Sequence, residues 1–181
     1  MPNPPALPLP LPRTAAADGR APESWAEVRA HDHVMRYRRS GAGRVVLVLH
    51  ADGDDGAADS LWPELAAALA ERFRLIVPEA PADGADVADV SAWLGDFLEG
   101  LGVSGVALVA ADRLCIPALE LALLDTDQIA RVVLVPGGPA TESGLDGALA
   151  TTARRTSIPL LVVRRGTPAA EAVPLVMGFL G

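Results

Sequence analysis

Asp112 is the residue whose type and position best suit it to chemistry. It lies in the stretch VSGVALVAADRLCIPALELAL (residues 103–123), after a continuous apolar run and before a segment with helical spacing. A carboxylate at such a turn can act as a nucleophile or as a general acid/base. It can equally cap the free N–H groups at the start of a helix. The residues themselves leave both roles open.

His50 is a second candidate, because it ends another apolar run. The stretch RVVLVLH (residues 44–50) is rich in β-branched residues, which is typical of a strand covered on both faces. His50 is either a base that serves Asp112 or a structural residue of the following loop. The other two histidines are His31 and His33, so no histidine in this chain follows Asp112.

Three other features could do chemistry, and each also has a simpler interpretation. The acidic loop at residues 52–59 could bind Ca²⁺ or Mg²⁺ through oxygens, but it lacks the EF-hand spacing, so we expect a solvated loop and no metal. Cys115 is either reactive or a small packing residue on a helix. Arg164 and Arg165 could pair with an anionic ligand or form surface ion pairs.

The composition narrows the possible partners. A formal net charge of −8 argues against nucleic acid and anionic membranes. All fifteen basic residues are arginine, which excludes a lysine Schiff base and a P-loop lysine. A single cysteine and the lack of a leader-like N-terminus favour the cytoplasm. No cofactor is indicated, and the sequence does not fix the oligomeric state.

The elements that must position these residues alternate along the chain. Residues 25–39 predict an antiparallel hairpin with a turn at His31 and Asp32. A helix is expected over 61–73, with Ser60 as its N-cap and Pro63 in its first turn, and another ends at a glycine near residue 102. Further helices are expected after residue 112, within 142–155 and over 169–180. Strands are expected near 44–50, 74–79, 106–111, 131–136 and 159–164.

This alternation predicts an α/β fold with a mostly parallel central sheet, helices on both faces and an antiparallel N-terminal hairpin. The first 22 residues are rich in proline and alanine, which predicts a flexible tail. The remaining residues, 23–181, form the predicted domain. Open sheets of this kind bind ligands at the carboxyl ends of their strands, where we expect Asp112.

Several segments together resemble the α/β-hydrolase superfamily. GRVVLVLHADG is similar to the family's strand that ends in a His-Gly loop, and LVAADRLCIPALELA aligns without a gap to its nucleophile turn and following helix. This resemblance covers residues 25–181. Asp112 stands at the nucleophile position, while Ala110 and Leu114 replace the flanking glycines. Because Pro117 falls within the following helix, we expect that helix to start late or to kink.

The resemblance also implies roles for other residues. Backbone N–H groups of Arg113 and of Ala51 or Asp52 would form an oxyanion hole, and Glu142 is the best substitute for the catalytic acid. Members with an aspartate nucleophile need a later histidine to activate water, and this chain has none. The spacing of the last strands leaves no room for a lid domain, and the chain is expected to stop before the strand and loop that carry the histidine.

Two functions follow from these observations. The first is a hydrolase-like protein without a Ser-His-Asp triad, which binds a small organic molecule or a protein partner without hydrolysis. The alternative is an enzyme that uses Asp112 as general acid/base or nucleophile: a lyase, isomerase, cyclase or unusual hydrolase acting on a small organic substrate. The burial of Asp112 separates the two, because an exposed carboxylate at this turn is only a cap.

Overall fold

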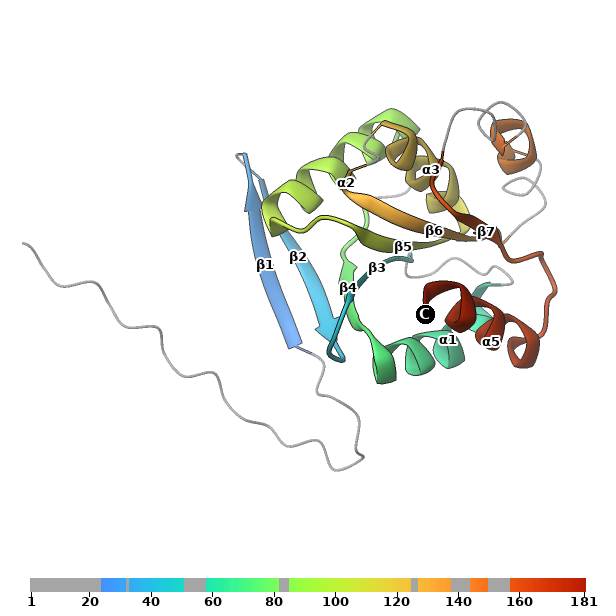
Figure 1. Cartoon of the computed structure of the whole chain (residues 1–181). Coiled ribbons are helices and arrows are strands. Elements are labelled where there is room, and N and C mark those ends of the chain that lie inside the picture. Colours follow the sequence, from blue (N-terminus) through green and yellow to red (C-terminus); the bar gives the residue numbers. More distant parts are fainter. Residues whose placement is uncertain are drawn as a thin grey trace, which may run out of the picture.

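The computed structural model describes residues 24–31, 33–50, 58–81, 85–124, 127–137, 144–149 and 157–181. They form a central sheet between two layers of helices (Figure 1). The strands are β1 (Ser24–Ala30), β2 (His33–Ser40), β3 (Val45–Leu49), β4 (Arg74–Pro78), β5 (Val106–Ala111), β6 (Ile129–Val135) and β7 (Leu160–Val162). The helices are α1 (Ala58–Arg72), α2 (Val87–Leu101), α3 (Cys115–Leu124) and α5 (Ala169–Leu180), with the 3₁₀ turn η1 (Asp112–Leu114) and a short helix over 144–149.

The sheet has the order β1-β2-β4-β3-β5-β6-β7. β1 pairs antiparallel with β2, and β2 pairs antiparallel with β4. The remaining pairs, β4 with β3, β3 with β5, β5 with β6 and β6 with β7, are parallel. The expected α/β fold with an antiparallel N-terminal hairpin is therefore confirmed. The tail predicted over 1–22 lies outside the described residues.

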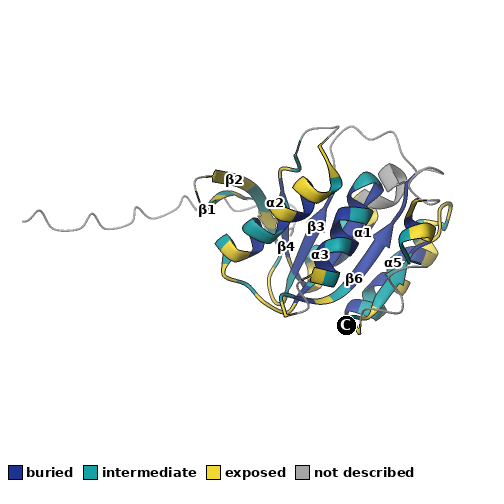
Figure 2. Cartoon of the chain, turned by 90° about the horizontal axis from the view of Figure 1, so that it is seen from above, coloured by how far each residue is buried: buried dark blue, intermediate teal, exposed yellow. Residues whose placement is uncertain are grey.

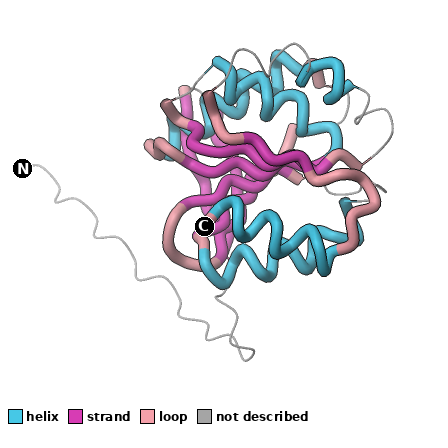
Figure 3. Tube along the Cα trace, turned by 45° about the vertical axis from the view of Figure 1, so that its right-hand side comes forward, coloured by secondary structure: helices cyan, strands magenta, loops and turns pink. Residues whose placement is uncertain are grey.

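The two faces of the sheet carry separate cores, because side chains of a strand alternate between its faces. Leu108 and Ala110 of β5 point to the face covered by α2 and α3, whereas Val109 and Ala111 point to the face covered by α1 and α5. Figure 2 shows the central strands buried and the outer sides of the helices exposed, and Figure 3 shows the helices on the two sides of the sheet.

The helix ends show what local signals can and cannot fix. As predicted, α2 ends at a glycine: Gly102 adopts the left-handed conformation, and the Asp86 carboxylate caps the other end by accepting from the Ala88 N–H at 3.0 Å.

The expected start of α1 was wrong. The helix begins at Ala58, so Ser60 is inside its first turn and is not its N-cap, and Pro63 lies beyond the first turn.

No helix in the described parts of the chain is long and apolar enough to cross a membrane.

Candidate functional site

The register of the parallel strands brings the candidate residues to one edge of the sheet. Leu49 of β3 pairs with Ala110 of β5, and Ala111 pairs with Val135 of β6. The next residues along these three strands, which include His50 and Asp112, therefore follow neighbouring strand ends. This is the carboxyl edge, where open α/β sheets bind ligands. The predicted position of Asp112 is confirmed.

Asp112 occupies a sharp and buried turn. Its φ is 50°, in the left-handed region that only one other non-glycine residue of the described chain, His31, adopts. Its exposed fraction is 4%. Aspartate accepts this backbone conformation more readily than most residues, but it is still unfavourable. The sharp turn therefore persists although Ala110 and Leu114 replace the family's glycines, and Leu114 is accommodated in the core at 1% exposure.

The N-cap interpretation of Asp112 does not fit its place in the helices. The 3₁₀ turn begins at Asp112 itself, and its N-cap is Ala111, which makes no side-chain cap bond. The α-helix starts only at Cys115. An N-cap residue normally has extended backbone, whereas Asp112 is left-handed. The late start of the helix agrees with the expectation from Pro117, which falls in the first turn of α3, where a missing N–H costs least.

Gly137, which the sequence reasoning missed, lies directly against the Asp112 carboxylate. A Cβ atom built on Gly137 would overlap Oδ1 of Asp112 and would lie 2.5 Å from its Cγ. Only glycine lets the chain after β6 pass so near the carboxylate. The sequence did hold a signal: after the apolar run of β6, a pair of glycines follows Pro136.

Cys115 is a buried packing residue rather than a reactive thiol. It is completely inaccessible, and its Sγ lies 3.4 Å from the carbonyl oxygen of Ala110. Burial raises the pKa of the thiol from its ordinary 9.0 to about 12; the nearby Asp112 charge adds to that rise, and a backbone hydrogen bond from Val135 opposes it. A neutral thiol is a poor nucleophile at neutral pH.

Arg113 connects this turn to the end of β4. Its guanidinium Nη2 donates a 2.8 Å hydrogen bond to the carbonyl oxygen of Pro81. The Arg113 side chain is half-buried. Its bond to Pro81 holds Arg113, the residue directly after Asp112, in place. Its backbone N–H stays the described candidate for an oxyanion-hole donor.

The other predicted residues are only partly tested. His50 is half-buried and follows β3, as expected. Ala51, Asp52 and Glu142 lie outside the described residues, as does the first part of the acidic loop. Arg164 and Arg165 are exposed beyond the end of β7.

Comparison with known proteins supports the fold. No protein-family model matches the sequence, and no curated protein matches it by sequence. Among solved structures, a serine hydrolase involved in carbazole degradation superposes with a TM-score of 0.54 at 20% identity, over 71% of this chain and 57% of its own. The epoxide hydrolase CorEH gives 0.51 at 20% identity, over 63% and 42%. The haloalkane dehalogenase DatA from Agrobacterium tumefaciens C58 gives 0.51 at 17% identity, over 62% and 40%.

These similarities establish an α/β-hydrolase fold for this chain. Sequence identities this low show a shared fold but not a shared activity. The chain spans between 40% and 57% of the length of these three structures.

Proposed function

We propose that this protein binds a small organic molecule at the carboxyl edge of its sheet and does not hydrolyse it. The observation that carries the proposal is the buried, left-handed Asp112 at the end of β5. Proteins keep an unfavourable backbone conformation mainly where function requires it. Asp112 holds such a conformation at the point where folds of this type bind their ligands.

The chemistry of this edge limits the ligand. A buried carboxylate accepts hydrogen bonds and favours donors or positive charge beside it. A ligand with a hydroxyl, amide or amine group would add a donor at this edge. The backbone N–H of Arg113 would donate to an oxygen of the same molecule, while the Arg113 side chain donates to the carbonyl oxygen of Pro81. The proposed ligand therefore carries both a donor and an acceptor.

One observation supports binding without hydrolysis. Within this chain no histidine follows Asp112, so an ester formed on Asp112 would lack the usual base that activates water. Nucleophilic catalysis by Asp112 is thus the less favoured role.

A second function is favoured by the same place at the carboxyl edge: an enzyme that transfers a proton through Asp112. Carboxyl groups serve as general acids and bases in enzymes. His50 follows the neighbouring strand and would be the second proton carrier. Such an enzyme would catalyse an isomerisation or elimination and would need no covalent intermediate.

Native mass spectrometry of the purified chain tests the proposal. We expect a retained small molecule in the native protein and in Ser104→Ala, whose exposed loop lies before β5, and its loss in Asp112→Asn. Retention in Asp112→Asn at the native level would contradict the proposed anchor. Conversion of the released molecule by fresh protein, lost in Asp112→Asn, would favour the enzyme.

A further inference from the structure

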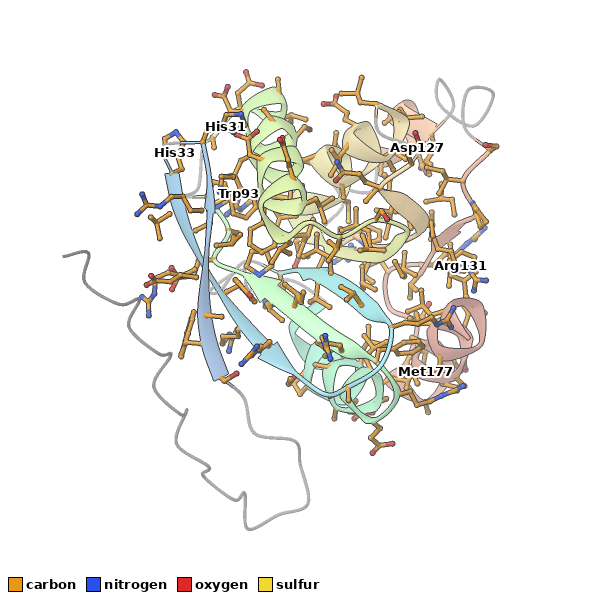
Figure 4. All side chains as sticks on the ribbon, turned by 60° about the vertical axis from the view of Figure 1, so that its left-hand side comes forward. His31, His33, Trp93, Asp127, Arg131 and Met177 are labelled. Atoms are coloured by element: carbon orange, nitrogen blue, oxygen red, sulfur yellow. The ribbon has the colours of Figure 1, made fainter. Side chains whose placement is uncertain are left out.

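Three side chains that can bind metals converge between the N-terminal hairpin and α2. His31 lies in the turn between β1 and β2, and Asp96 and Glu99 lie on α2. One ligating atom from each lies within 4.8 Å of the other two. Nδ1 of His31 and Oδ1 of Asp96 lie 3.7 Å apart. Figure 4 shows His31 at the tip of the hairpin, beside the helix, with His33 further along the same hairpin.

The backbone fixes this arrangement independently of any metal. Asp96 and Glu99 are three residues apart on a helix, which puts them on one face. The hairpin approaches that helix closely at Gly100, where a Cβ atom would lie 2.9 Å from Cγ2 of Val28 and 3.2 Å from the carbonyl oxygen of Arg29. His31 has φ 51°, so the chain reverses sharply at the residue that supplies the imidazole.

An ordinary ion pair does not account for the whole group. A solvent-exposed histidine–carboxylate pair contributes only about 0–1 kcal/mol, and the side chains of His31 and Asp96 are 63% and 42% exposed. Such a pair would not need Glu99 as a third neighbour. Arg36 of the same hairpin forms its ion pairs elsewhere, with Glu27 and with Glu79.

We propose that His31, Asp96 and Glu99 form a Zn²⁺ site that ties the β1–β2 turn to α2. One imidazole and two carboxylates are a common ligand set for Zn²⁺, whereas Mg²⁺ and Ca²⁺ prefer oxygen alone. The two carboxylates balance the charge of the ion when the imidazole is neutral. The exposure of the site leaves room for water as the fourth ligand.

The distances are compatible with metal binding after a small adjustment. With bonds of about 2.0–2.2 Å, ligand atoms around tetrahedral Zn²⁺ lie about 3.3 Å apart. The 4.8 Å group must therefore contract. Exposed side chains can do this by changing rotamer, while the two elements that carry them stay in place.

Zinc titration of the full-length, tag-free chain tests the site. After treatment with a chelator, we expect isothermal titration with Zn²⁺ alone to show one ion per chain, with no comparable signal for Mg²⁺. His31→Asn should abolish this binding, since asparagine tolerates the left-handed backbone but offers no imidazole. Asp96→Asn and Glu99→Gln should each weaken it at least tenfold.

Matched controls make the result specific. His33→Asn changes an exposed histidine of the same hairpin, and Asp89→Asn changes an exposed carboxylate in the first turn of the same helix. Both should bind Zn²⁺ like the native chain. Unchanged circular dichroism of His31→Asn would show that it folds. The proposal is overturned if the native chain binds no Zn²⁺, if His31→Asn binds equally well, or if His33→Asn loses as much.

Discussion

The carboxylate of Asp112 occupies the space that the side chain of any residue other than glycine would need at position 137. A Cβ atom there would overlap Oδ1 and would lie 2.5 Å from Cγ. Asp112 follows β5 and Gly137 follows β6, so the contact joins two neighbouring strand ends at the carboxyl edge. The conformation of Asp112 and the glycine at position 137 therefore depend on each other.

Gly137→Ala should destabilise the protein because the new methyl group and the carboxylate cannot occupy the same space. Overpacking of a filled site costs about 1–3 kcal/mol. We expect a loss in that range from the urea dependence of unfolding. Gly178→Ala is the control, since nothing lies within 4 Å of that helical position and alanine is the better helix former.

A double-mutant cycle should show that the cost comes from Asp112. Once Asp112→Ala has removed the carboxylate, Gly137→Ala should cost at least 1 kcal/mol less than it does in the native chain, which is within the range of coupling between residues in contact. Additive effects of the two substitutions would show that Asp112 and Gly137 do not constrain one another.

Asp112→Asn and Asp112→Ala should separate the backbone role of this residue from its charge. Asparagine keeps the size and the tolerance for positive φ, so we expect the melting temperature to change little. Alanine lacks that tolerance and should lower the free energy of unfolding by about 1–2 kcal/mol. Thermal and urea unfolding of the two variants measure these changes in stability. If Asn is as destabilising as Ala, the carboxyl group itself stabilises the fold, and the tolerance for positive φ does not account for the loss.

Activated p-nitrophenyl esters should be hydrolysed no faster than in buffer, because no serine of the described chain lies at the carboxyl end of β5. Ser91 is buried in α2, where its hydroxyl donates to the carbonyl oxygen of Val87 at 2.9 Å, and Ser104 precedes β5. Robust hydrolysis that disappears in Ser91→Ala or Ser104→Ala would mean that a different turn carries the nucleophile.

Cys115 should make the protein less stable in alkali. Its pKa is raised from 9.0 to about 12 in the folded chain, so the unfolded chain loses the thiol proton first. This contribution to stability is complete below pH 9 and is lost at up to about 1.4 kcal/mol per pH unit as the pH rises towards 12. Comparing unfolding of the native chain and Cys115→Ala between pH 8 and 11 isolates the effect. Parallel curves for the two proteins would contradict it.

The same burial should protect the thiol from alkylation. At pH 7.5, iodoacetamide should modify Cys115 only when the protein unfolds, because the group is inaccessible and neutral. Mass spectrometry with and without urea measures this directly. Rapid modification of the folded chain would show that the face of α3 that carries Cys115 opens readily.

The sequence by itself determined the order of the elements and the position of Asp112. Continuous apolar runs, such as 106–111, are long enough to mark strands buried on both faces, and Gly102 marks the end of α2. These signals are local, so they can be read without the rest of the chain. The α/β class followed, because alternating strands and helices have few ways to pack.

Only the tertiary structure decided what surrounds Asp112. Asp112 has a left-handed φ and is buried because Leu114 and Cys115, which follow it, pack in the core. Gly137, 25 positions after Asp112, lets the chain after β6 pass against the carboxylate. The approach of His31 to Asp96 likewise depends on the packing of the hairpin at Gly100. Such contacts join residues far apart in the chain, and a local pattern holds no information about the distance between them.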